Sequence, residues 1–249
     1  MEYPACKGPS GRHNRLATLT EILRPLIFPV HRAGVPFILA FLAGTIILWL
    51  IWVPLLFVGL VLTVWCVFFF RDPERLTPTR PGLIVSPADG VVQMVVEAPP
   101  PPELDMGAEP LPRISVFMNV FNCHVNRSPV DGKVVKLAYR PGKFFNASLD
   151  KASEHNERQA VRIQASDGRD YACVQIAGLV ARRILCDLQP DQAIRAGARI
   201  GMIRFGSRVD LYLPKGVAPM AVPGQTAVAG ETVFADVTRN EPAWQGEMR

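Results

Sequence analysis

The uncharged stretch GVPFILAFLAGTIILWLIWVPLLFVGLVLTVWCVFFF, residues 34–70, decides the architecture of this chain. As one straight helix its 37 residues would measure about 56 Å, nearly twice the ~30 Å hydrocarbon core of a bilayer. Pro54 lies in the middle, where a proline breaks or kinks a helix. The stretch therefore predicts two helical legs of about 27 Å each, joined near Trp52, Val53 and Pro54.

The charges on both sides of this stretch predict how it meets a membrane. Arginines precede and follow it, at positions 12, 15, 24, 32, 71, 75 and 80. Because positive flanks favour the cytoplasmic side, both flanks are expected there, which requires an even number of crossings or a re-entrant hairpin. We therefore expect a hairpin membrane anchor at 34–70, with one tilted crossing as the alternative. Residues 1–33 are expected to lie at the interface, with an amphipathic helix over 16–27.

The remaining residues, 71–249, have the pattern of a single strand-rich domain. β-branched runs alternate with Gly, Pro and Asp turns, and no long amphipathic helical pattern interrupts them. The predicted strands are 90–97, 114–118, 133–139, 160–164, 171–177, 179–185, 199–204, 209–213 and 232–235. Such short, closely spaced strands predict a mainly β fold, either a sandwich or a barrel. The prolines at 99–102 and the polar residues up to 112 predict a long surface loop.

A weak internal echo also bears on the fold. Asp-Gly-Val-Val at 89–92 resembles Asp-Gly-Lys-Val-Val at 131–135, and residues 224–233 have the pattern of a lipoyl or biotinyl carrier. The echo suggests lipoyl-like barrel elements. Since Asp-Gly is also a common turn dipeptide, hairpin turns alone are the simpler explanation.

Composition excludes several classes of protein. The chain is 49% hydrophobic and has no heptad or Gly-X-Y repeat, which excludes disordered, coiled-coil and collagen-like chains; a single uncharged run excludes a polytopic transporter. Its five cysteines are far apart, so we expect no disulfide framework, no structural zinc and a reducing compartment. Residues 1–75 carry seven Lys or Arg and four Asp or Glu, which favours anionic lipid over nucleic acid as a partner.

The segment RFGSRVD, residues 204–210, contains the only Gly-Ser pair of the chain, between two strand-like runs. A serine hydroxyl can attack the preceding carbonyl and convert the amide into an ester, and β-elimination then leaves a pyruvoyl group. Gly206 would permit the strained backbone, and Ser207 would be both the nucleophile and the source of the leaving group. On its own, a Gly-Ser pair is more often a turn.

Six segments in order resemble the phosphatidylserine decarboxylase proenzymes of the short bacterial and archaeal type. They are VHRAGVPF (30–37), FRDPER (70–75), VSPADG (85–90), FNCHVNRSP (121–129), EHNER (154–158) and FGSRVD (205–210). The resemblance extends over almost all of residues 31–235.

This resemblance implies a self-processing enzyme of phospholipid biosynthesis. Cleavage between Gly206 and Ser207 would give a β chain, 1–206, and an α chain, 207–249, which form a heterodimer. Ser207 would become a pyruvoyl group whose ketone forms a Schiff base with phosphatidylserine and draws off electrons, giving phosphatidylethanolamine and carbon dioxide. No external cofactor or metal is then expected. The catalytic domain would lie on the cytoplasmic face of the cell (inner) membrane.

The resemblance also implies roles for side chains. Asp89 would be an orienting or basic carboxylate in self-cleavage, although a turn aspartate is usually solvated. His124 would transfer protons in cleavage, in protonation of the carbanion, or in both. The larger branch of the family has His-x-x-His where this chain has His124-Val125-Asn126-Arg127, and an arginine cannot act as a base. Either His124 covers both roles or another residue, such as His155, assists.

The other polar motif residues are expected to contact substrate. Arg127 would clamp the lipid phosphate or the leaving carboxylate, for which its planar guanidinium is suited. Asn156, Glu157 and Arg158 resemble a family motif, with a charged surface turn as an equally good interpretation. Three alternatives for function stay open: a membrane-tethered, non-enzymatic carrier or adaptor, a pyruvoyl decarboxylase for a soluble amino acid, and an ether-lipid substrate with the same reacting atoms.

Overall fold

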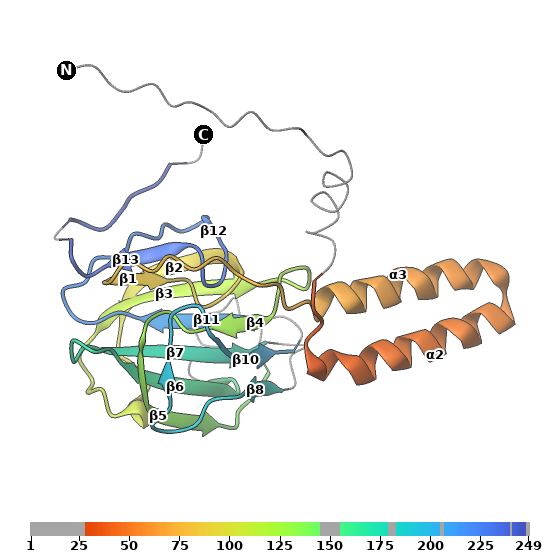
Figure 1. Cartoon of the computed structure of the whole chain (residues 1–249), viewed down its shortest axis with the longest axis horizontal. Helices are drawn as coiled ribbons and strands as arrows, with labels where there is room; N and C mark the ends of the chain where they lie inside the picture. The colour runs from red at the N-terminus through yellow and green to blue at the C-terminus, as the bar shows by residue number, and fades with distance from the viewer. Residues whose placement is uncertain (1–27, 145–154, 179–182, 205–206, 240, 248–249) are drawn as a thin grey trace, which may run out of the picture.

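An eight-stranded antiparallel sheet dominates the computed structural model, which describes residues 28–144, 155–178, 183–204, 207–239 and 241–247. Its strand order is β12-β2-β3-β11-β7-β6-β5-β9 (Figure 1). The bounds of these strands are β2 Gly90–Ala98, β3 Leu111–Met118, β5 Gly132–Arg140, β6 Arg158–Gln164, β7 Asp170–Ala177, β9 Ala193–Ile194, β11 Ser207–Tyr212 and β12 Thr226–Ala227.

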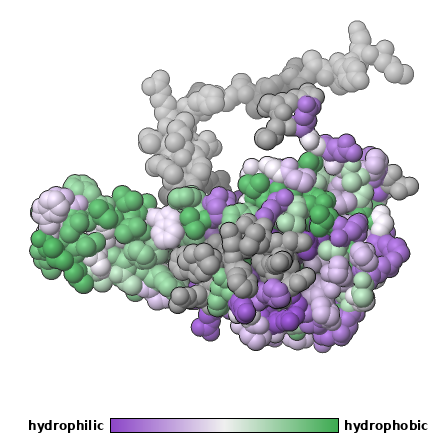
Figure 2. Space-filling model, turned by 180° about the vertical axis from the view of Figure 1, so that it is seen from behind, coloured by the Kyte–Doolittle hydropathy of each residue, from purple (hydrophilic) through white to green (hydrophobic). Residues whose placement is uncertain are grey.

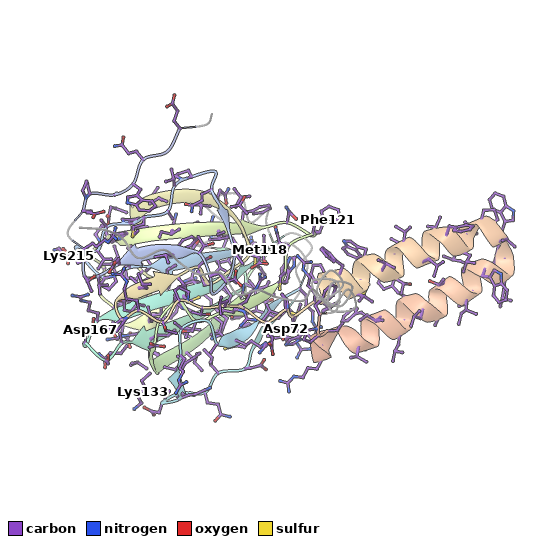
Figure 3. All side chains as sticks on the ribbon, turned by 45° about the horizontal axis from the view of Figure 1, so that its top comes forward. Asp72, Met118, Phe121, Lys133, Asp167 and Lys215 are labelled. Carbon is purple, nitrogen blue, oxygen red and sulfur yellow. The ribbon has the colours of Figure 1, made fainter. Side chains whose placement is uncertain are left out.

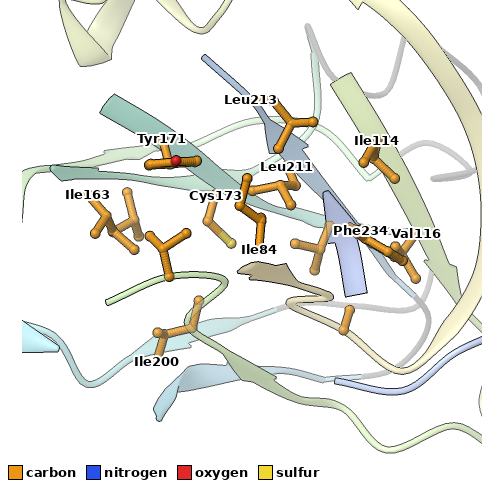
Figure 4. Packing of buried hydrophobic residues seen from close by; sticks show 14 of the residues in the cluster. Ile84, Ile114, Val116, Ile163, Tyr171, Cys173, Ile200, Leu211, Leu213 and Phe234 are labelled. Atoms are coloured by element: carbon orange, nitrogen blue, oxygen red, sulfur yellow. The ribbon is translucent and has the colours of Figure 1, made fainter. Parts of the chain in front are cut away.

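Two smaller sheets face the large one. The first has the order β4-β10-β8, and the second pairs β1 with β13. Their strands are β1 Leu83–Val85, β4 Val125–Arg127, β8 Ile184–Cys186, β10 Arg199–Ile203 and β13 Val233–Asp236. The main hydrophobic core draws residues from all three sheets, such as Leu211 of the large sheet, Ile200 of β10 and Ile84 of β1 (Figure 4).

Alternation along the central strand β11 defines two faces of the large sheet. Val209 and Leu211 belong to the main core, and we call this the inner face. The residues that alternate with them, Arg208 and Asp210, point to the outer face, where they form a fully buried ion pair of 2.8 Å. Because side chains alternate with period two, Ser207 lies on the inner face with Val209.

These sheets confirm the predicted mainly β fold. Each predicted strand has a counterpart within a few residues, except that 179–182 lie outside the described residues, so β8 covers only the end of the run 179–185. The short strands β1, β4, β9 and β12 were not predicted, because two or three residues are too few to show alternation. The lipoyl-like barrel elements are not confirmed. Both Asp-Gly turns open strands of the large sheet, β2 and β5, but the strands before them, β1 and β4, belong to the two smaller sheets, so neither turn closes a hairpin.

The prediction of a surface loop over 99–112 is wrong in part. The 3-10 helix η3, Pro102–Leu104, packs Leu104 fully buried against the outer face of the sheet, together with Val174 and Tyr212. Strand β3 already begins at Leu111. The apolar side chain of Leu104 shields the outer face of the sheet from water, so this segment belongs to the hydrophobic core on that face.

Residues 34–70 fold as the predicted pair of helices. Helix α2, Val35–Ile51, and helix α3, Val53–Phe69, are separated by the extended residue Trp52 and run back alongside each other (Figure 1). Pro54 lies in the first turn of α3, where its missing N–H costs no helical hydrogen bond. The expected interfacial helix at 16–27 lies outside the described residues.

The two helices are held together by small and hydroxylated residues. Thr45 Oγ1 and Thr63 Oγ1 are 3.0 Å apart, and each also donates to a carbonyl of its own helix. A Cβ at Gly59 would lie 2.9 Å from the Thr45 backbone, so only glycine permits this approach. Toward the outside, large apolar side chains are bare; Leu50 is 73% exposed and Val61 is 68% exposed (Figure 2). The segment Arg32–Ile51 is long and apolar enough to cross a membrane, and Val53–Phe69 is somewhat shorter.

The hairpin joins the β body at a site that we call the hairpin root, residues 28–37 and 68–75. Here the two flanks of the hairpin bridge each other: His31 N donates to Phe70 O (2.8 Å) and Asp72 N donates to Pro29 O (2.7 Å). Gly34 packs directly on Phe70, where a Cβ would come within 2.5 Å of the ring. The segments 30–37 and 70–75, far apart in sequence, therefore form one unit.

Candidate active site

Ser207 begins β11 at the centre of the large sheet. Its neighbours are Met118 on β3 and Ala177 on β7. The residue is fully buried, and among the described residues its hydroxyl has no hydrogen-bond partner. A buried hydroxyl without a hydrogen bond lowers the stability of the fold by roughly 1–3 kcal/mol. Such a group in a native protein therefore indicates a chemical role. Gly206 lies outside the described residues.

His124 lies in the loop between β3 and β4, fully buried. Its Nδ1 is 2.9 Å from the Asn122 carbonyl, which can only accept, so Nδ1 carries the proton and Nε2 presents a lone pair. Nε2 has no partner among the described residues. The backbone of His124 accepts from Ile203 N (3.2 Å), which ties the histidine to the end of β10, shortly before Ser207.

The hairpin root supplies the surroundings of His124. The ring of Phe69, the last residue of α3, stacks on the imidazole at 4.1 Å between centroids. Burial lowers the pKa of His124 to about 4; the Asn122 carbonyl opposes this shift, and the charge of Arg71 adds to it. The imidazole is therefore neutral near pH 7 and suited to act as a base. Figure 3 shows Asp72 and Phe121 at the end of the body from which the hairpin projects.

Asp89 lies in the turn before β2, as predicted, but its carboxylate is already engaged. Oδ1 accepts from Ala229 N (2.7 Å) and Oδ2 from Arg75 (2.6 Å). Among the described residues, no hydrogen bond joins Asp89 to His124 or Ser207. Burial, and secondarily the charge of Asp89, raises the pKa of Cys123, so the carboxylate lies near the His124 loop. Its role in self-cleavage stays a prediction.

A family model described as "Phosphatidylserine decarboxylase" matches residues 62–235, which include Ser207, His124 and Asp89. The chain belongs to the phosphatidylserine decarboxylase family. It is similar to proteins named "Phosphatidylserine decarboxylase proenzyme". It is 62% identical to the one from Paramagnetospirillum magneticum over 92% of this chain and 95% of the relative. It is 58% identical to the one from Cereibacter sphaeroides over 92% and 99%, and 60% identical to the one from Ruegeria pomeroyi over 84% and 95%.

Family membership confirms the resemblance drawn from the motifs and makes the chain an enzyme of the decarboxylase class. Nothing in these comparisons favours the alternative of a non-enzymatic carrier. Within the described residues, no group of three His, Cys, Asp or Glu side chains is arranged to hold a metal ion.

Arg127 was expected to clamp an anion of the substrate. Its guanidinium group is instead engaged by other residues of this chain. It donates to Gly197 O and Pro73 O, each at 2.7 Å, and lies 3.5 Å from Asp72. The residue is 6% exposed. These contacts fasten the segment that leaves the hairpin to the β body and favour a structural role.

The motif at 154–158 divides between the two faces of the sheet. Asn156 Nδ2 donates to the carbonyl of Ala177 (2.7 Å), the β7 neighbour of Ser207, and Glu157 O accepts from Ala177 N. Arg158 instead forms a two-point ion pair with Glu103 of η3 on the outer face. His155 lines an outer-face cavity of about 670 Å³ with Arg158. The structure therefore brings Asn156 close to Ser207 and places Arg158 on the opposite side.

Two buried amides near Ser207 were missed by the sequence analysis. Gln175, on β7 and the inner face, donates to Asn126 Oδ1 (2.8 Å), and both are fully buried. This bond directs Asn126 Nδ2 toward Met118 Sδ (3.5 Å), a weak acceptor, on the strand beside Ser207. The signal was present: Gln175 interrupts the otherwise apolar run YACVQIA, and Asn126 lies within the His124 motif.

Proposed function

We infer that this chain cleaves itself between Gly206 and Ser207 and then decarboxylates phosphatidylserine to phosphatidylethanolamine. The observation that carries the proposal is the buried Ser207 hydroxyl, which has no partner among the described residues and lies in the family's Gly-Ser segment. The products are a β chain, 1–206, and an α chain, 207–249, which stay together because β11 lies between β3 and β7 in one sheet.

The surroundings of Ser207 fit a pyruvoyl group. Conversion of the serine removes the one polar atom of this side chain that lacks a partner among the described residues, and Met118 and Ala177 enclose the position. When present, the pyruvoyl ketone supplies the electron sink that decarboxylation of an amino acid requires.

Self-cleavage uses groups of this chain and one water molecule. His124 Nε2 accepts the proton of Ser207 Oγ, and Oγ attacks the carbonyl carbon of Gly206. The C–N bond breaks, the serine nitrogen takes up a proton, and an ester results. Loss of the Ser207 α-proton then releases the Gly206 carboxylate, and water replaces the nitrogen as ammonia, leaving the ketone. His124 suits the first step because it is neutral and its Nε2 is not engaged by another described residue.

During turnover, the same chain must place and release protons. His124, once protonated, is a strong acid because its pKa is low, and it can return its proton to the substrate α-carbon after carbon dioxide leaves. Asn126 Nδ2 offers a buried donor near Ser207 for charge that develops in either reaction. Asn156 fixes the β7 edge beside the reacting residue.

The apolar hairpin supports a position of this site at a membrane surface. The bare apolar flanks of α2 and α3 lose their contact with water if they enter the bilayer, and the last residue of α3 stacks on His124. The reacting centre then lies at headgroup depth, with the β body on the cytoplasmic face of the cell membrane. The four described cysteines are free, as a reducing compartment would keep them.

A decarboxylation assay with defined substrates tests this function. Purified protein in detergent micelles should release carbon dioxide from phosphatidylserine and not from free serine. Hydroxylamine, which captures ketones, should stop the reaction. Equal release from free serine would favour the soluble-substrate alternative, and no release from the lipid would contradict the proposal.

A further inference from the structure

The arginines around the hairpin root differ in how their guanidinium groups are satisfied. Five of them have acceptors: Arg32 with Asp187, Arg71 with the Phe68 and Phe121 carbonyls, Arg75 with Asp89, Arg127 with the Gly197 and Pro73 carbonyls, and Arg199 with Asp72. Their positive charges and N–H groups are used in holding the root to the β body.

Arg204 is different. It follows β10, three positions before Ser207, and is half-buried. Its Nε is fully buried and has no hydrogen-bond partner among the described residues, and none of them forms an ion pair with it. Its guanidinium instead lies over the ring of Phe37, 5.2 Å from the centroid, in the first turn of α2.

A second arginine lies beside it. Arg204 N donates to Arg183 O (3.2 Å), so the two residues are backbone neighbours. Burial lowers the pKa of Arg204, and the charge of Arg183 lowers it further. No described residue forms an ion pair with Arg183. Two adjacent cations, one of them half-buried, that are not paired with a carboxylate of the described residues are stabilised when an anion binds between them.

We propose that Arg204, assisted by Arg183, binds the phosphodiester of the lipid substrate. The proposal rests on the proposed function. Phe37 holds Arg204 at the hairpin root, which is the depth of lipid phosphates when the hairpin is in a bilayer. Because Arg204 precedes Ser207 by three residues, their Cα atoms are at most roughly 11 Å apart, so a lipid whose phosphate meets Arg204 can bring its serine headgroup to Ser207. Arg204 thus takes the role that the sequence suggested for Arg127.

The chemistry of the reaction selects the phosphate over the carboxylate as the ligand. The carboxylate loses its charge when it leaves as carbon dioxide, so an arginine bound to it would stabilise the ground state more than the transition state. The phosphodiester keeps its charge from substrate to product. A guanidinium at this group therefore contributes binding without opposing the reaction.

Variants of the full-length protein separate this role from others. Arg204→Gln should raise KM for dihexanoyl phosphatidylserine roughly ten- to hundredfold, with kcat changed far less, because a charge-assisted hydrogen bond is lost. The KM of Arg204→Lys should lie between those of Arg204→Gln and the unsubstituted protein, and Arg183→Gln should raise KM less than Arg204→Gln does. Arg32→Gln, which removes a root arginine paired with Asp187, is the matched control and should leave KM unchanged. The intact mass of each variant shows whether it is processed. If Arg204→Gln is not processed, the KM values of Arg204→Lys and Arg183→Gln are compared with that of the unsubstituted protein instead.

A binding measurement tests the phosphodiester subsite at Arg204 without turnover. Dihexanoyl phosphatidylmethanol has the phosphodiester but neither amine nor carboxylate, and its ³¹P NMR line should broaden with the unsubstituted protein and with Arg32→Gln, but not with Arg204→Gln. Equal broadening with Arg204→Gln would overturn the proposal, as would equal competition by inorganic phosphate, which would indicate a free-phosphate site. If the protein binds this lipid through Arg204 yet releases no carbon dioxide, the proposed function fails and the subsite stands.

Discussion

At the scale of single residues, two groups of the candidate site are buried without hydrogen-bond partners among the described residues. The Ser207 hydroxyl and His124 Nε2 are both of this kind. A folded protein rarely retains such groups without a use for them. Here the proposed use is proton transfer by His124 and nucleophilic attack by Ser207.

Replacing Ser207 separates fold from chemistry. Ser207→Ala should remain a single chain without activity and should melt at the same temperature or higher, because it removes an unsatisfied buried hydroxyl. Ser207→Cys should be cleaved slowly. Denaturing gels and thermal melts check this. Cleavage of Ser207→Ala at the same site would exclude the serine as nucleophile.

The low pKa of His124 predicts an unusual pH dependence. Neutral imidazole is the proposed base of self-cleavage, so the rate of processing should fall as the pH drops through about 4, not through the ordinary 6.5. In the same interval the unfolded chain protonates His124 and the folded chain does not, so the unfolding free energy should rise with pH from about 4 to 6.5. Rate profiles and denaturant titrations measure both effects.

His124→Gln is the control for that profile. It should slow processing or turnover strongly and flatten the pH dependence of stability between pH 4 and 6.5. If the rate of the unsubstituted protein falls near pH 6.5 instead of near pH 4, the imidazole of His124 is not buried from water as described. Normal processing and turnover in His124→Gln would remove the residue from the site.

At the scale of elements, the end of the hairpin contacts the candidate active site. Phe69 closes one face of the imidazole, and Cys123 Sγ donates to Arg71 O (3.2 Å), so the exit of α3 and the His124 loop move together. Changes at the end of α3 should therefore be felt in catalysis.

Phe69→Ala tests this coupling. Water would reach the imidazole, the pKa of His124 would rise toward its ordinary value, and the acid limb of the processing rate should move to higher pH by one unit or more. Phe57→Ala, on the same helix but 65% exposed, should leave the limb in place. An unchanged limb in Phe69→Ala would mean that the stack does not set the basicity of His124.

The 3-10 helix η3 has a purely structural task. Glu103→Gln breaks the two-point pair with the buried Arg158, and the unfolding free energy should fall by about 1–3 kcal/mol while kcat is retained. The matched control is Glu109→Gln, whose partner Lys215 is exposed and which should cost less than about 1 kcal/mol. Denaturant titration measures both. A loss of kcat in Glu103→Gln would place the outer face in the catalytic machinery.

Local patterns accounted for most elements of the fold. Strands of five or more residues show alternation, and Pro54 marks where one apolar run becomes two helices. What escaped prediction depends on tertiary contacts. Leu104 looks like a loop residue until the sheet face that it covers is known, and β4 has too few residues for a period.

At the scale of the whole molecule, the site forms where the hairpin root, the β4-β10-β8 sheet and the large sheet meet. The motifs near 30–37, 70–75 and 121–129 pointed to the right segments. They could not assign partners, and partners decide roles: Arg127 is saturated by carbonyls, whereas Arg204 has no ion-pair partner among the described residues. Likewise the contacts of Asn126 with Gln175 and with Met118 form only when β3, β4 and β7 are assembled.

The intact mass of active, purified protein tests the central claim most directly. The account predicts two chains, 1–206 and 207–249, the shorter one lighter by one ammonia than a chain that begins with serine. A full-length chain in active material, or a shorter chain that begins with unmodified Ser207, would contradict it.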